Sequence, residues 1–176
     1  MTTEYETSNE KLQRGLTVSS FTTVCLTPSP FVCFSTRQTS RAADLFALRK
    51  YFIVHLLPAT PKSAKLAESF SKSNLSPHHD AFVKNPFDLA SWRRHENWEL
   101  PILDDILGAF LCKVDRTMDV GDHRLWIAEV KDTFLEESID NPALAYSDRR
   151  YRTEGDPRWP HNTTGEENSE KADVHT

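Results

Sequence analysis

The sequence predicts a single, mainly β domain with two helices on its flanks. Its length of 176 residues suits one domain. Two stretches, residues 41–49 and 62–71, carry apolar residues at helical spacing. Runs rich in apolar and β-branched side chains, which favour pleated strands, recur at residues 17–26, 31–34, 51–57, 108–114 and 124–135.

The first two predicted strands are separated by a turn with two prolines at residues 27–30. Residues 17–26 are dense in hydroxyl and branched side chains, which favours an extended conformation. Residues 31–34 form a short, continuous apolar run bounded by turn residues. Such a run is typical of a strand buried on both faces.

A polar turn at residues 35–40 leads directly into the first predicted helix. It carries four hydroxyl groups and the positive charge of Arg37, and Thr39 or Ser40 can cap the helix. The N–H groups of a first helical turn attract anions, and hydroxyls with an arginine add charge-assisted hydrogen bonds. The turn is therefore either a phosphate site without a glycine-rich loop or an ordinary capped helix after a solvated turn.

Several motifs, taken in order, resemble the flavin reductase-like family, whose fold is an FMN-binding split β-barrel. The similarity covers about residues 15–152. The motifs are Gly-Leu-Thr-Val-Ser-Ser-Phe-Thr at 15–22, Pro-Ser-Pro-Phe-Val-Cys-Phe-Ser at 28–35, Thr-Ser-Arg at 39–41, Tyr-Phe-Ile-Val-His-Leu-Leu at 51–57, Gly-Asp-His at 121–123 and Arg-Arg-Tyr-Arg at 149–152. The resemblance favours the phosphate interpretation of the polar turn.

The resemblance also implies a set of site residues. The flavin is expected to lie over residues 17–20 and 35–40, with the backbone of Val18, Ser19 and Ser20 facing its ring and Thr17 also in contact with the cofactor. His123, in the Gly-Asp-His motif, is expected to orient the nicotinamide, although the motif alone indicates only a turn. The flavin phosphate is expected at Ser35, Arg37, Thr39 and Ser40, and Thr36 and Arg41 are expected among the other residues that bind the cofactor.

The function implied by the resemblance is reduction of FMN or FAD by NADH or NADPH, in a homodimer that supplies reduced flavin to a separate oxygenase. Hydride transfer between two cofactors needs no protein acid or base, because the cofactors hold the reactive atoms. Two alternatives stay open. One is a non-catalytic flavin-binding dimeric module, and the other is a split-barrel oxidoreductase that retains its FMN.

Both ends of the chain are polar. Residues 1–14 have no hydrophobic period and are predicted to be a flexible arm. The domain is then expected to lack the N-terminal helix and first strand that its relatives have, and this absence motivates the non-catalytic alternative. Residues 153–176 are acidic and almost devoid of aliphatic side chains, which predicts a disordered tail.

Composition argues against several classes of partner. A net charge of -5 argues against a nucleic-acid or anionic-membrane surface. No apolar run approaches the roughly 18 residues of a membrane span, and no apolar signal region begins the chain. The three cysteines lie in apolar runs without a Cys-X-X-Cys pair, which favours free thiols and an intracellular location, cytoplasmic or mitochondrial. His78-His79-Asp80 lacks the ligand spacing of a structural zinc site, so no metal is expected.

Overall fold

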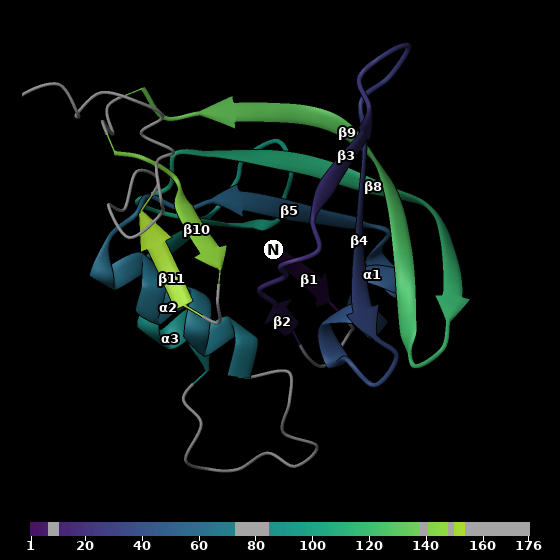
Figure 1. Ribbon diagram of the computed structural model, residues 1–176, viewed down its shortest axis with the longest axis horizontal. Coiled ribbons are helices and arrows are strands. Elements are labelled where there is room, and N and C mark those ends of the chain that lie inside the picture. Colours follow the sequence, from purple (N-terminus) through teal and green to yellow (C-terminus); the bar gives the residue numbers. More distant parts are fainter. Residues whose placement is uncertain (7–10, 73–84, 138–140, 148–149, 154–176) are drawn as a thin grey trace, which may run out of the picture.

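In a computed structural model the chain forms a curved antiparallel sheet with helices packed against it (Figure 1). The structure describes residues 1–6, 11–72, 85–137, 141–147 and 150–153. Its helices are α1 (Arg41–Arg49), α2 (Pro61–Lys72) and α3 (Pro86–Leu89). Its strands are β1 (Thr2–Glu6), β2 (Lys11–Gly15), β3 (Thr22–Cys25), β4 (Phe31–Arg37), β5 (Tyr51–Leu56), β6 (Trp92–Arg94), β7 (Pro101–Leu103), β8 (Gly108–Val120), β9 (His123–Leu135), β10 (Leu144–Ser147) and β11 (Arg150–Thr153).

The main sheet of the described residues has seven strands in the order β2-β1-β5-β8-β9-β4-β3. The long β8–β9 hairpin lies at its centre and bends visibly in Figure 1. Register shifts between Leu111 and Cys112, and between Val114 and Arg116, place β-bulges in this hairpin. Bulges bend a strand and increase its twist, so the sheet rolls around its core. The expected mainly β fold is confirmed, and the curvature is consistent with a split barrel.

Four fully buried aromatic rings hold α1 against the concave face of the sheet. Phe34, Phe52 and Trp126 come from β4, β5 and β9, and Phe46 comes from α1. Phe46 stacks on Phe52 with ring centroids 5.0 Å apart, and Phe34 stacks on Trp126 at 6.1 Å. Because such rings bury large apolar areas, they fix the position of the α1 N-terminus relative to the end of β4.

The two longer helices occur where the sequence predicts them, and α3 is an additional short helix. Helix α1 has the predicted bounds, and α2 extends the prediction for residues 62–71 by one residue at each end. The strand predicted over residues 17–26 is confirmed only for residues 22–25, which form β3, and the prediction is wrong for residues 17–21. The polar turn is shorter than expected, since β4 continues through Ser35, Thr36 and Arg37.

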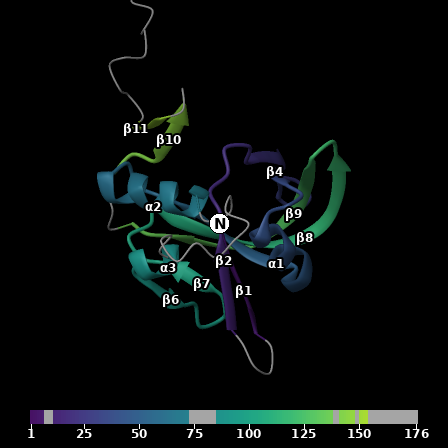
Figure 2. The same ribbon diagram turned by 90° about the horizontal axis from the view of Figure 1, so that it is seen from below.

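The prediction of a flexible arm at residues 1–14 is wrong. Strands β1 and β2 form an antiparallel hairpin, and β1 also pairs with β5 through Thr2 and Ile53. The side chains of Thr2, Thr3 and Glu4 are buried. Figure 2 shows this hairpin at the edge of the sheet, with α1 on one side and the β6–β7 pair on the other. The chain therefore does supply strands ahead of residue 15, contrary to the expected absence.

Hydrogen bonds explain why such polar residues are buried. The Thr2 hydroxyl donates to the Pro101 carbonyl at 2.6 Å, and the Thr3 hydroxyl donates to the Tyr51 carbonyl at 2.8 Å. The carboxylate of Glu4 pairs with Arg94 and with Lys11. Buried polar groups are tolerated when they are paired in this way.

Two further predictions lie outside the described residues, namely the tail from residue 154 onward and the His78-His79-Asp80 run. Within the described parts of the chain, no helix has the length and apolar character needed to cross a membrane.

Candidate functional site

A polar pocket of about 290 Å³ opens between the segment that precedes β3, the end of β4, the start of β9 and the ends of two helices. Its lining combines many hydroxyl groups with one arginine and one histidine. The lining residues are Leu16, Thr17, Val18, Ser19, Ser20, Ser35, Thr36, Arg37, Thr39, Ser40, Ser71 and His123.

One wall is the irregular segment from Leu16 to Ser20, which three contacts hold in place. The amide of Leu16 donates to the Met1 carbonyl at 2.9 Å. The hydroxyl of Thr17 donates to the carbonyl of Ala67 in α2 at 2.7 Å. At the other end of the segment, the Ser20 hydroxyl oxygen accepts from the Ser35 amide at 2.9 Å. The wall is therefore bonded to β4 as well as to α2.

A tight turn connects β4 to α1 at the far end of the pocket. The Ser40 amide donates to the Arg37 carbonyl at 3.1 Å. Ser40 is the N-cap of α1, and its hydroxyl accepts from the amide of Ala43 at 3.4 Å. Hydroxyls, a helix N-terminus and the Arg37 charge therefore meet at one end, which is the arrangement that favours an anion.

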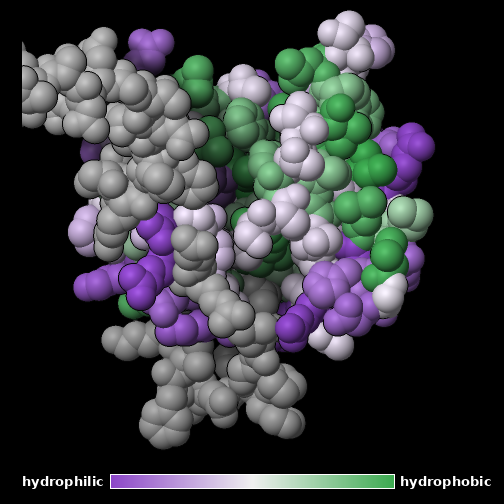
Figure 3. Space-filling view, viewed as in Figure 1, coloured by the Kyte–Doolittle hydropathy of each residue, from purple (hydrophilic) through white to green (hydrophobic). Residues whose placement is uncertain are grey.

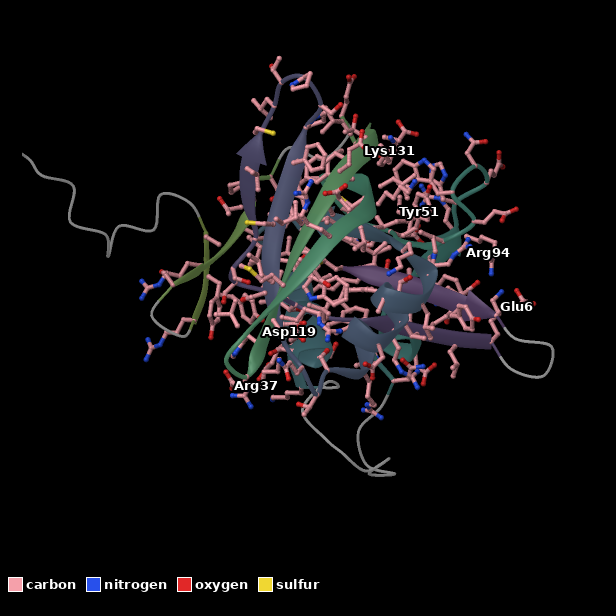
Figure 4. The ribbon with its side chains drawn as sticks, turned by 90° about the vertical axis from the view of Figure 1, so that its right-hand side faces the viewer. Glu6, Arg37, Tyr51, Arg94, Asp119 and Lys131 are labelled. Carbon is pink, nitrogen blue, oxygen red and sulfur yellow. The ribbon has the colours of Figure 1, made fainter. Side chains whose placement is uncertain are left out.

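The side chain of Arg37 forms no ion pair with any carboxylate of the described residues. It is exposed at the end of β4, and Figure 4 shows it at the same end of the sheet as Asp119. Its guanidinium can donate two parallel hydrogen bonds to an anion. We call the end of the pocket formed by Ser35, Thr36, Arg37, Thr39 and Ser40 the anion end.

His123 borders the anion end from the neighbouring strand. It faces Arg37 in the β4–β9 register. Its Nδ1 lies 2.7 Å from the Asp122 carboxylate, and this hydrogen bond is the main cause of the lowered pKa of Asp122. A carboxylate at Nδ1 orients the ring and leaves Nε2 for other partners.

The structure brings the residues expected at the site together in one pocket, with one exception. Thr17, Val18, Ser19 and Ser20 line it with the five residues of the anion end and His123, whereas Arg41 does not. Arg41 is the first residue of α1 and is not among the residues that line the pocket. The roles assigned to these residues stay predictions.

Sequence reasoning missed Leu16, Ser71 and a smaller adjoining compartment of about 160 Å³. This compartment shares Thr17, Val18, Ser19 and Ser71 with the main pocket, and Tyr146 and Tyr151 close its other side. Helix α2 and the β10–β11 hairpin lie far along the chain from residue 17, so the Arg-Arg-Tyr-Arg motif, which contains Tyr151, does not by itself indicate these contacts. Among the described residues, no cluster of three His, Cys, Asp or Glu side chains could hold a metal ion.

A curved antiparallel sheet with a hydroxyl-lined pocket at a helix N-terminus defines a mainly β protein whose pocket suits a phosphorylated ligand. Comparison of the sequence with known families gives the particular class. The chain belongs to the family described as flavin reductase like domain, which it matches over residues 2–155.

Individual relatives agree with this assignment. The chain is 29% identical over 139 residues to the NADH:FMN oxidoreductase of Rhodococcus qingshengii, covering 78% of this chain and 66% of that protein. The chain thus spans slightly less than two thirds of this relative's length. The styrene monooxygenase flavin reductase of Pseudomonas putida S12 is 28% identical and covers 86% of each chain, with a TM-score of 0.64. The NADH:FAD oxidoreductase SgcE6 of Streptomyces globisporus shares the fold at 24% identity, with a TM-score of 0.67 over 86% of this chain and 82% of that one.

Proposed function

We propose that this protein is an NAD(P)H-dependent flavin reductase that binds FMN or FAD. The observation that carries the proposal is the convergence of the expected flavin contacts from three separate segments on one pocket. Family membership and the NADH:FMN oxidoreductase activity of the Rhodococcus relative support it. When bound, the flavin accepts a hydride from the reduced nicotinamide and so supplies the redox chemistry.

The pocket fits a flavin phosphate in charge and in donors. Arg37 provides an exposed cation, and Ser35, Thr39 and Ser40 provide hydroxyls beside the N-terminus of α1. Their combined role is to hold the phosphate and thereby set the position of the ring. The backbone from Thr17 to Ser20 then lies along the ring, because it forms the adjoining wall of the same pocket.

His123 is proposed to orient the nicotinamide. The Asp122 carboxylate accepts a hydrogen bond from Nδ1–H and so holds the ring, which leaves Nε2 of the neutral imidazole to accept a hydrogen bond from the carboxamide N–H of the nicotinamide. The protein's contribution to the reaction is then orientation, with no acid or base required.

The test of the proposal is NADH and NADPH oxidation by the purified protein, with and without added FMN or FAD. We expect oxidation to accelerate when free flavin is added. A protein that binds neither flavin, or that leaves both pyridine nucleotides unoxidised in its presence, contradicts the proposal. The same assay decides between FMN and FAD and between NADH and NADPH.

A separate oxygenase is proposed to consume the reduced flavin, as the name of the Pseudomonas putida relative says of that protein. The need for reduced pyridine nucleotide and the three unpaired thiols support an intracellular location. The alternative of a non-catalytic module rested on the expected absence of the first strand. Strands β1 and β2 are present at the edge of the main sheet, so this reason for the alternative no longer applies.

A homodimer is the proposed assembly, and the β3–β4 hairpin is its proposed contact surface. No charged residue lies between Arg14 and Arg37, and β3 is an edge strand of the main sheet. Val24 and Leu26 are 53% and 73% exposed on this hairpin, and Figure 3 shows hydrophobic side chains gathered over β3, β4 and β9. Two copies with net charge -5 can approach here without bringing like charges together.

The proposed homodimer is tested by analytical ultracentrifugation, which compares the oligomeric state of the wild type with those of the variants Val24→Lys and Leu48→Lys. Leu48 is 61% exposed on α1, away from the hairpin, and serves as the matched control. We expect a dimer that the first substitution dissociates and the second leaves intact. A monomeric wild-type protein, or a dimer indifferent to Val24→Lys, contradicts the proposed surface.

A further inference from the structure

Two tyrosines form a cross-strand pair on the β10–β11 hairpin. Tyr146 and Tyr151 face each other in the register of the two strands. Their ring centroids lie 5.0 Å apart with an interplanar angle of 54°. Tyr146 is 51% exposed, which leaves much of its ring surface uncovered by the described part of the chain.

The pair is held beside α2 and the pocket wall. The amide of Leu144 donates to the Leu57 carbonyl at 2.8 Å, and the amide of Ala59 donates to the Pro142 carbonyl at 2.8 Å. These bonds attach the start of the hairpin to the chain between β5 and α2. Figures 1 and 2 both show the hairpin next to α2. Burial, together with nearby Tyr146 and Glu68, raises the pKa of Tyr151, in agreement with this position.

The tyrosines lie on the side of the pocket away from the anion end. Their compartment borders Thr17, Val18, Ser19 and Ser71, which also line the main pocket. None of the five residues of the anion end borders it, and neither does His123. A ligand that has its phosphate at the anion end and its ring along Thr17 to Ser19 therefore points its ring toward the tyrosines.

The lining of the main pocket has no Phe, Tyr or Trp side chain, its one aromatic ring is the polar imidazole of His123, and only Leu16 and Val18 are apolar. A large planar ring gains most of its binding free energy from flat apolar contact. Among the residues lining the two compartments, Tyr146 and Tyr151 are the ones that offer a large phenol ring, whereas His123 offers only a small polar imidazole.

We propose that Tyr146 and Tyr151 form the wall against which the planar ring of the flavin packs, while the anion end holds its phosphate. This inference rests on the proposed flavin binding. An isolated two-stranded hairpin is marginally stable, so the ring also stabilises β10 and β11 when it binds.

The experiment compares binding of riboflavin, FMN and FAD by fluorescence titration of the full chain. The variants are Tyr146→Ala and Tyr151→Ala, with Tyr146→Phe and Tyr151→Phe as matched controls that keep the ring. Each alanine variant is expected to weaken riboflavin and FMN binding by the same factor, between about fivefold and a hundredfold, as for loss of one stacking contact. The phenylalanine variants are expected to stay within about twofold of the wild type.

Equal losses for riboflavin and FMN support a contact with the ring, because riboflavin carries the ring without the phosphate. Unchanged affinity for both overturns the inference. So does a loss confined to FAD, because the pair would then hold the adenine ring. If the wild-type protein binds none of the three ligands, the proposed function is wrong. This result differs from an effect of the variants alone, so the test distinguishes failure of the proposed function from failure of the tyrosine wall.

Hydrogen exchange on the wild-type protein gives a second measurement that does not depend on the variants folding. Saturating riboflavin is expected to slow amide exchange in residues 144–147 and 150–153. Exchange in β6, which lies outside both compartments, is the internal reference and is expected to stay unchanged. Equal exchange of the hairpin with and without riboflavin overturns the proposed wall.

Discussion

The indole Nε1–H of Trp126 donates a hydrogen bond to the hydroxyl oxygen of Thr36 at 2.9 Å, and both side chains are buried. The bond joins β9 to β4 behind the anion end of the pocket. A hydroxyl that accepts one hydrogen bond keeps its own proton. The Thr36 hydroxyl can therefore donate toward the pocket while its oxygen is held by the core.

Thr36→Val is expected to lower the free energy of unfolding by about 1–3 kcal/mol, because the buried Trp126 N–H loses its acceptor. Thr36→Ser keeps the hydroxyl and should retain most of the stability. Urea unfolding followed by tryptophan fluorescence gives the comparison, and Thr22→Val, at an exposed position of β3, is the control. Equal stability of Thr36→Val and the wild type would show that the bond contributes nothing.

Glu4→Ala is expected to lower the free energy of unfolding by about 1–2 kcal/mol. The carboxylate is 4% exposed and pairs with Arg94 and Lys11, and Gln13 donates to it at 2.8 Å. Loss of a buried ion-pair partner can cost more, but Arg94 and Lys11 are partly exposed and regain water. Glu6→Ala, at the exposed end of β1, is the matched control. Identical unfolding curves for the two variants would show that the ion pairs of Glu4 do not stabilise the fold, as expected if residues 1–6 were a flexible arm.

The candidate site could be predicted from sequence to the extent that local motifs define it. The hydroxyls of residues 35–40 precede a capped helix, and a cap is a short-range feature. Gly121 adopts a φ of 58°, as the Gly-Asp-His turn requires. The family resemblance implied that these segments share one site, and in the structure they line one pocket.

The N-terminal hairpin could not be predicted in the same way, because its burial depends on distant partners. Thr2 and Thr3 are satisfied by the carbonyls of Pro101 and Tyr51, and Glu4 is satisfied by Arg94. Hydrophobic periodicity reports the spacing of apolar residues and does not indicate such long-range polar contacts. The tyrosine pair was missed for a related reason, since a half-exposed pair on a short hairpin resembles any surface contact until its neighbours are known.

Arg37→Ala is expected to weaken FMN binding by about 10- to 100-fold, which corresponds to about 1.5–3 kcal/mol for a hydrogen bond to a charged group. Riboflavin binding should change little, because riboflavin has no phosphate. Fluorescence titration with both ligands measures the difference. Arg116→Ala, an exposed arginine paired with Asp115 on β8, is the control. Equal effects of Arg37→Ala on FMN and riboflavin would place the phosphate elsewhere.

His123→Ala is expected to raise the KM for the pyridine nucleotide about fivefold, the effect of losing one neutral hydrogen bond. Flavin affinity should change much less, since His123 only borders the anion end. Steady-state kinetics at saturating flavin gives the KM, and His123→Asn tests whether another hydrogen-bonding side chain restores it. A KM equal to that of the wild type would remove His123 from the nicotinamide site.

The Asp122–His123 contact also predicts a titration. The hydrogen bond from His123 lowers the pKa of Asp122 below its usual value of 3.8. A carboxyl with a lowered pKa stabilises the folded state above its usual pKa, and this contribution is lost as the pH falls through the lowered value. In His123→Ala, the pKa of Asp122 is expected to rise toward 3.8, as followed by carboxyl NMR. Asp119, whose pKa is lowered mainly by its hydrogen bond with Arg124, is the internal control and should titrate as before. An unchanged Asp122 titration in this variant would mean that His123 does not form this hydrogen bond in solution, and the ring would then lack the orientation that the nicotinamide contact requires.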